Sequence, residues 1–146
     1  MYLDETGFER DAPRTHGYGK IGQRVYGKRS GNSRPRTSLL LAQQGKKLLA
    51  PMLFAGTCNQ HVFNAWVEQV LLPEIPPRSL VIMDNAAFHK HLSTKTLIES
   101  AGHVLLFLAP YSPDHNPIEN TFSGLKSFRR KTQLQPDELV RQYLFK

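Results

Sequence analysis

The chain has 146 residues, the usual size of one domain, so residues 1–146 are expected to fold as a single unit. Its 40% hydrophobic and 21% charged residues exclude a wholly disordered protein, and its longest apolar run, Val104 to Ala109, is too short to cross a bilayer. The net charge of +7 favours an anionic partner such as nucleic acid. Acidic residues near the start argue against a signal peptide, and Cys58 has no second cysteine to pair with. These features together predict a cytoplasmic protein.

The excess positive charge lies in residues 10–36, which hold eight Lys and Arg residues and one Asp. Five glycines and two tyrosines are interleaved with them, a pattern typical of a hairpin or loop. We expect this basic segment to follow a DNA phosphate backbone, and a solvated loop without a partner is the alternative. The residues expected to bind DNA here are Arg14, Lys20, Arg24, Lys28 and Arg29.

The next segments read as strands and then a helix. Two apolar runs, Arg36 to Gln43 and Lys47 to Ala55, flank a Gln-Gly-Lys turn and predict antiparallel strands. From Asn59 the hydrophobic period changes to that of an amphipathic helix, which we expect Pro73 to close. An antiparallel meander followed by a helix is therefore predicted.

A strand, a helix and another strand follow. Ser79 to Met83 has the composition of a buried central strand, Ala87 to Ala101 is a weakly periodic helix stopped by Gly102, and Val104 to Leu108 is a second short buried strand. This order predicts a parallel strand pair joined by a helical crossover.

Two helices end the chain. Asn116 is placed to cap a helix whose first residue is Pro117, and Pro136 to Phe145 predicts the last helix. The fold class is thus α/β, with an antiparallel meander followed by parallel strands in one mixed sheet and helices on both faces.

Three acidic residues lie where a predicted element starts or ends: Asp4, Asp84 and Glu119. Each has an ordinary explanation, because Asp4 suits a solvated terminus, Asp84 a turn, and Glu119 the third residue of a capping box. Their spacing is a further observation: 34 residues, predicted to form one helix, one strand and a proline-rich turn, separate Asp84 from Glu119. Open sheets place active sites at such strand ends and helix starts.

The segments around these acids are LDETGF, VIMDNAAFHK and LAPYSPDHNPIEN. With the spacing, they resemble the catalytic domain of DDE-type transposases of the mariner-like insertion-sequence superfamily, or DDE superfamily endonucleases. The resemblance implies a ribonuclease-H-like fold in which Asp4, Asp84 and Glu119 are the catalytic residues. It also implies that they hold two Mg²⁺ or Mn²⁺ ions, which suits hard carboxylate ligands.

The same resemblance implies a function. Water would cleave phosphodiester bonds at transposon ends, and the freed 3′-hydroxyl would attack target DNA. The implied partners are double-stranded DNA and further copies of the chain, in a nucleoid-associated, bacterial-type cytoplasmic setting. Two alternatives remain open: a ribonuclease-H-like nuclease that does not transpose, and an inactive nucleic-acid-binding remnant of a transposase.

Other polar residues are candidates for supporting roles. Lys126 and Arg130 fall on the same helical stripe as Glu119 and are expected to bind phosphates, or else to be a solvated basic helix end. The residues expected to orient the ligands or the substrate are Asn85, His89, His115 and Asn116. His89 falls at the predicted helix start, where a surface position is the ordinary expectation.

The chain also differs from its full-length relatives. They carry an N-terminal helix-turn-helix region, whereas only three residues precede Asp4, so the first strand is expected to be short and Asp4 loosely placed. DNA recognition would then come from a partner chain or a frameshift fusion, unless the chain is a decayed fragment.

Overall fold

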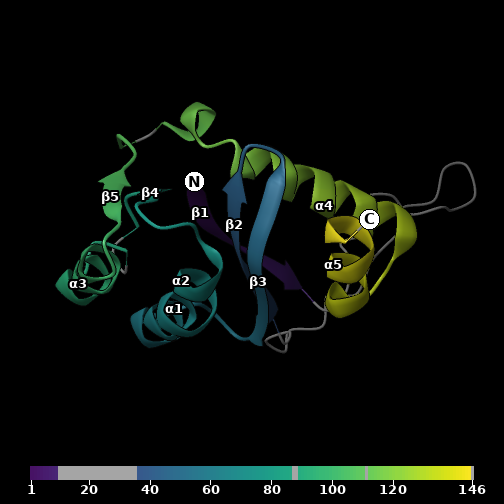
Figure 1. Ribbon diagram of the computed structural model, residues 1–146. Coiled ribbons are helices and arrows are strands. Elements are labelled where there is room, and N and C mark those ends of the chain that lie inside the picture. The colour runs from purple at the N-terminus through teal and green to yellow at the C-terminus, as the bar shows by residue number, and fades with distance from the viewer. Residues whose placement is uncertain (10–35, 87–88, 111, 146) are drawn as a thin grey trace, which may run out of the picture.

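The computed structural model describes residues 1–9, 36–86, 89–110 and 112–145. Its strands form one mixed sheet in the order β3-β2-β1-β4-β5 (Figure 1). The strands are β1 (Tyr2–Glu9), β2 (Arg36–Gln44), β3 (Lys47–Ala55), β4 (Leu80–Met83) and β5 (Val104–Phe107). The pairs β1–β2 and β2–β3 are antiparallel, whereas β4 is parallel to both β1 and β5. This topology confirms the predicted meander followed by parallel strands.

Helices cover both faces of this sheet, as predicted. The helical segments are α1 (Gln60–Trp66), the π-helical turn η1 (Val67–Leu71), α2 (Leu72–Glu74), α3 (Leu92–Ser100), the 3₁₀ turn η2 (Pro113–His115), α4 (Ile118–Thr132) and α5 (Pro136–Leu144). One hydrophobic cluster packs α1, η1 and α3 against one face, and a second packs α4 and α5 against the other. Figure 1 shows α4 running across the meander and α5 beside β3.

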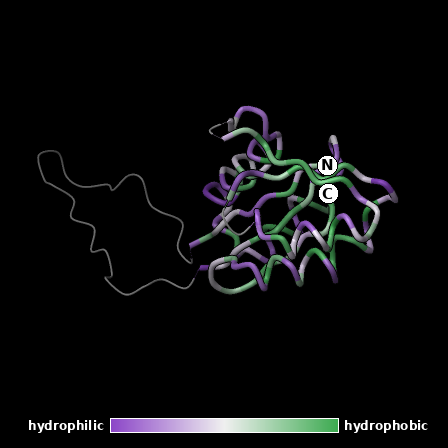
Figure 2. The backbone as a smooth tube through the Cα atoms, turned by 90° about the vertical axis from the view of Figure 1, so that its left-hand side faces the viewer, coloured by the Kyte–Doolittle hydropathy of each residue, from purple (hydrophilic) through white to green (hydrophobic). Residues whose placement is uncertain are grey.

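Strand β2 lies at the centre of both clusters. Leu40 and Ala42 point into the first cluster, while Leu39 and Leu41 point into the second, and all four are 0% exposed. A strand buried on both faces is a continuous apolar run, which is why RTSLLLAQ has no polar alternation. In Figure 2 hydrophobic stretches of the backbone run through the interior of the described part of the chain, and many of its outer turns are hydrophilic. No helix among the described residues is long and apolar enough to span a membrane.

Two predicted helix boundaries are wrong. The helix after Asn59 does not close at Pro73, because α2 continues to Glu74 with the proline in its first turn, where a missing N–H costs little. Helix α3 starts at Leu92 instead of Ala87, with His91 as its N-cap. Residues 87–88 lie outside the described residues.

The prediction that the last strand is buried is also wrong. Val104 and Leu106 of β5 are 57% and 50% exposed. They pair with Leu80 and Ile82 of β4, so these apolar side chains share one face of the sheet. The reason is position: β5 is an edge strand, and α4 packs over β1 instead of β4 and β5.

Helix α4 is fixed to its neighbours by two close contacts. Its Gly124 leaves room for the ring of Tyr143 in α5, where a Cβ atom would collide with the tyrosine hydroxyl. The buried side chain of Arg129 donates hydrogen bonds to the carbonyls of Glu9 (2.6 Å) and Leu134 (3.3 Å). The C-terminal part of α4 is therefore held against the end of β1.

Candidate active site

Asp4 lies inside β1, not at the end of an element as expected. The strand runs from Tyr2 to Glu9, and Asp4 pairs with Leu41 of β2, so it is not loosely placed. On the other side of β1, Leu3 pairs in parallel register with Met83, the last residue of β4. Because parallel strands in register send equivalent side chains to the same face, the next residues, Asp4 and Asp84, come out side by side.

Glu119 comes from α4, which packs over one face of the sheet at β1. It lies in the first turn of α4, which packs over β1 (Figure 1), and its side chain is exposed. Its backbone N–H donates a hydrogen bond to the carbonyl of Asn116 at 3.1 Å. Three segments far apart in the sequence thus bring Asp4, Asp84 and Glu119 to one end of the sheet.

The electrostatics of Asp4 reflect this arrangement. Its pKa rises to about 6, mainly because burial disfavours the charged carboxylate, and repulsion from Asp84 and Glu119 raises it further. A hydrogen bond from the Glu5 backbone and the charge of His89 act in the opposite direction. Asp4 therefore lies within electrostatic reach of both other acids. Across the described ranges, no three His, Cys, Asp or Glu side chains are close enough to share one metal ion.

Asp84 is held by the loop that follows it. Its Oδ1 shares a hydrogen bond with Nδ1 of His89 at 2.5 Å and accepts another from the Ala86 backbone at 3.1 Å. The His89 hydrogen bond is the main cause of a lowered pKa for Asp84. His89 itself is 1% exposed, and its ring centroid lies 4.6 Å from that of Phe63 in α1. The expectation of a surface histidine at a helix start is wrong, because the turn before α3 folds inward.

The contact between Phe63 and His89 was not predicted from the sequence. The two residues are far apart in the chain, and no local pattern joins them. A similar tether connects the two parallel strands, because Asn85 Nδ2 donates to the carbonyl of Leu108 at 3.0 Å just after β5. Asn85 and His89 are thus built into the loop that carries Asp84.

The other two predicted supporting residues differ from each other. Asn116 is 3% exposed, and its Nδ2 donates a hydrogen bond to Oδ2 of Asp4 at 3.1 Å. Its predicted role as the helix cap is wrong, since α4 begins after Pro117 with no side-chain cap. His115 is exposed in η2, and its role stays a prediction.

Comparisons with known proteins give a family and a fold for this chain. The family model described as DDE superfamily endonuclease matches residues 1–139. This chain belongs to that family. The DDE domain also resembles two solved structures. The Mos1 strand transfer complex has a TM-score of 0.73 at 20% identity, and the match covers 99% of this chain and 45% of the Mos1 chain. The mariner Mos1 paired end complex with Mg has a TM-score of 0.74 at 20% identity, and the match covers 99% of this chain and 46% of the Mos1 chain.

A third similar structure is the Mos1 transposase catalytic domain with Raltegravir and Mg, which has a TM-score of 0.68 at 18% identity and matches 99% of this chain and 67% of that one. Together these likenesses establish the ribonuclease-H-like fold. The DDE domain spans about half the length of the Mos1 chains in the two complexes. Comparison with curated proteins finds no matching sequence.

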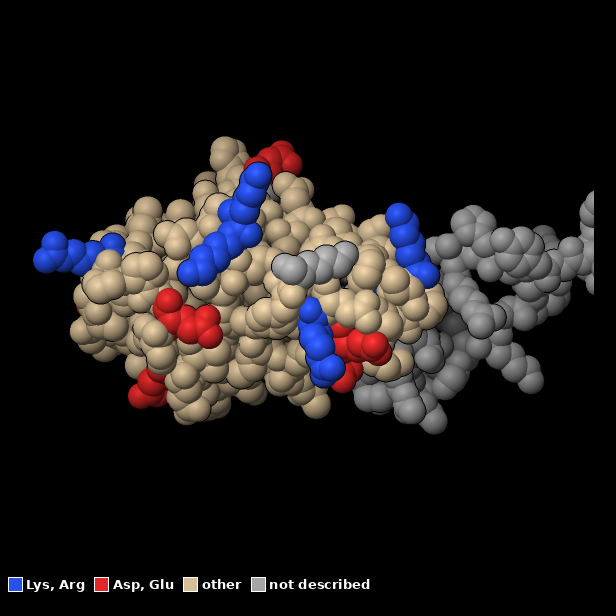
Figure 3. Space-filling model, turned by 45° about the vertical axis from the view of Figure 1, so that its right-hand side comes forward, with Lys and Arg blue, Asp and Glu red and all other residues tan. Residues whose placement is uncertain are grey.

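The basic residues of the DDE domain are only partly described. Lys126 and Arg130 are exposed on α4, on the stripe that begins at Glu119. Figure 3 shows Lys and Arg spaced over one face with acidic residues between them, without a continuous basic patch on the described part. Five predicted DNA-binding residues lie outside the described residues: Arg14, Lys20, Arg24, Lys28 and Arg29.

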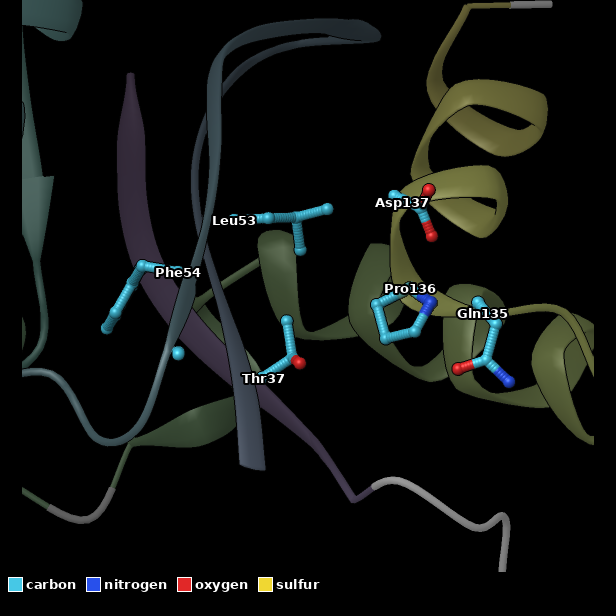
Figure 4. Close-up of a pocket in the computed structure, with 7 residues that line it drawn as sticks. Thr37, Leu53, Phe54, Gln135, Pro136 and Asp137 are labelled. Atoms are coloured by element: carbon cyan, nitrogen blue, oxygen red, sulfur yellow. The ribbon is translucent and has the colours of Figure 1, made fainter. Parts of the chain in front are cut away.

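A surface hollow of the DDE domain lies away from the acids. It is bounded by the ends of β2 and β3 and by the start of α5, where Figure 4 shows Thr37, Leu53 and Pro136 around it. Thr37 pairs with Phe8, four residues along β1 from Asp4. The hollow therefore does not belong to the acidic site.

The hydrogen bond between His89 and Asp84 leads to a testable expectation. His89→Phe keeps an aromatic ring against Phe63 but removes the bond that orients the Asp84 carboxylate. We expect Mn²⁺ affinity, measured by titration calorimetry, to fall about 10- to 100-fold. His61→Phe, at an exposed position on α1, is the matched control and should bind Mn²⁺ as the unsubstituted chain does. Equal affinities for the two variants would exclude this role for His89.

Proposed function

We propose that this chain is the catalytic domain of a DNA transposase, which cleaves phosphodiester bonds at transposon ends and joins the resulting 3′-hydroxyl to target DNA. One observation supports the proposal: Asp4 inside β1 lies within electrostatic reach of both Asp84, after β4, and Glu119, in the first turn of α4, and both acids raise its pKa. Membership of the DDE superfamily endonuclease family and the fold shared with Mos1 support the same reaction class.

The three carboxylates suit a hard divalent cation. Carboxylate oxygens are the ligands that Mg²⁺ and Mn²⁺ prefer, and mutual repulsion among the acids is relieved by positive charge. The similar Mos1 structures include one with Mg and one with Mn. We propose that Asp4, Asp84 and Glu119 together would hold two such ions.

The ions would supply charge stabilisation for the attacking and leaving oxygens of an in-line displacement. The chain's own residues hold the ligands: β1 fixes Asp4, while His89 and the Ala86 backbone hold Asp84. Exposed Lys126 and Arg130 on α4 would bind DNA phosphates next to Glu119. The basic segment before β2 would add contacts along the duplex.

Partners complete the proposal. The substrate is double-stranded DNA, both transposon end and target. Sequence recognition would come from a further DNA-binding region, and we propose that active complexes contain more than one copy of the chain. His115 would support the loop that leads to Glu119.

A joining assay tests the reaction. A labelled duplex with a free 3′-hydroxyl is incubated with supercoiled plasmid, the chain and Mn²⁺, and we expect labelled plasmid to form together with nicked plasmid. Nicking without joining would contradict a transposase and identify a plain nuclease. DNA binding without either product, with Mg²⁺ and with Mn²⁺, would identify an inactive remnant.

A further inference from the structure

One buried residue, Asn116, contacts both Asp4 and the backbone of Glu119. Asn116 donates through Nδ2 to Oδ2 of Asp4 at 3.1 Å, and its backbone carbonyl accepts the N–H of Glu119 at 3.1 Å. These contacts connect positions 112 residues apart in the chain, β1 and the loop before α4. Asn116 therefore links Asp4 directly to the turn that carries Glu119.

The position is not explained by helix capping. An Asn just before a helix usually caps it by accepting a backbone N–H through its side chain, but α4 has no side-chain cap. Instead, Asn116 is 3% exposed, and its Oδ1 is buried without a hydrogen-bond partner among the described residues. A buried polar atom without a partner costs stability. The Asn116 amide thus donates to Asp4, and it does not cap the N-terminus of α4.

The other end of α4 is fixed separately. Arg129 donates to the carbonyl of Glu9 at the end of β1, five residues after Asp4. Helix α4 is consequently tied to β1 at two points, one at each end. Loss of the Asn116 contact would leave the helix packed through its buried apolar face and held at Arg129, but it would remove the hydrogen bond that sets Asp4 relative to the turn carrying Glu119.

We propose that Asn116 is a positioning residue that sets the separation of Asp4 and Glu119, and hence the affinity of the acidic site for divalent cations. This inference rests on the proposed function, because it assumes that the acids hold metal. Asn116 acts through Asp4 and through the turn that carries Glu119. It is not itself a ligand.

A charge-exchange experiment in EDTA tests the contact without any metal. Asn116→Asp replaces the donor by a carboxylate against Asp4, so the melting temperature should fall. The double variant Asn116→Asp with Asp4→Asn restores one donor and one acceptor in exchanged places, so Asp4→Asn should raise the melting temperature more in the Asn116→Asp background than in the unsubstituted chain. Equal gains in the two backgrounds would overturn the proposed contact.

Manganese titration of the full chain tests the consequence. Asn116→Ala should lower Mn²⁺ affinity about 10- to 100-fold, whereas Asn120→Ala, at an exposed position on the same helix, should leave it unchanged. The exchanged double variant should stay impaired, because it lacks the Asp4 carboxylate. Normal Mn²⁺ affinity in Asn116→Ala, with loss of binding in Asp84→Asn, would overturn the role of Asn116 alone. Normal affinity in both variants would count against the proposed metal site as well.

Discussion

Asp84→Asn should reduce Mg²⁺- or Mn²⁺-dependent strand cleavage by at least about 1,000-fold, which corresponds to about 4 kcal/mol of transition-state stabilisation. The substitution keeps the shape of the side chain and its hydrogen bond with His89, but it removes a charge that the proposed cations need. DNA binding measured by fluorescence anisotropy should change little and should keep its dependence on salt, because phosphate contacts come from basic residues elsewhere.

The matched control is Asp137→Asn, which removes a carboxylate from the exposed first turn of α5. Cleavage by this variant should equal that of the unsubstituted chain. Cleavage retained by Asp84→Asn at a comparable rate would mean that the reaction takes place elsewhere or without this ligand.

Asp4→Asn should have opposite effects on stability without and with metal. Burial and the two neighbouring acids raise the pKa of Asp4 to about 6, so at pH 7.5 the metal-free fold contains an unfavourable buried charge. Removing that charge should raise the melting temperature in EDTA by a few degrees, given that about 1 kcal/mol shifts a domain of this size by about 2–4 °C. In Mg²⁺ the order should reverse, because only the unsubstituted chain gains stability from binding.

Differential scanning calorimetry in EDTA and in Mg²⁺ measures both halves of this expectation. Asp137→Asn, whose exposed carboxylate lies in the first turn of α5, should change the melting temperature by the same amount in EDTA and in Mg²⁺. A lower melting temperature for Asp4→Asn in EDTA would show that the Asp4 carboxylate stabilises the metal-free fold, contrary to its raised pKa.

The sequence predicted the strands of the sheet well, because their signals are local. The turn at Gly45 and the continuous apolar run of β2 are visible within a few residues. The exposed β5 was mispredicted for a physical reason: an apolar run of four residues, VLLF, looks the same whether it is central or at an edge. Which strand lies at the edge depends on the whole topology.

The three acids of the proposed site were predicted from motif and spacing. The residues that hydrogen-bond to these acids were only partly predicted. Asp4 proved to lie inside a full strand, since its pairing with β2 is a long-range property that the first few residues do not reveal. His89 is buried because Phe63, from another helix, packs on it. Asn116 binds Asp4 instead of capping α4, and a local capping rule does not anticipate a competing partner in β1.

Anomalous diffraction from crystals of the full chain grown with Mn²⁺ tests the central claim most directly. We expect two manganese peaks beside the carboxylates of Asp4, Asp84 and Glu119. Manganese bound away from these three residues, or any of the three carboxylates turned away from both peaks, would contradict it.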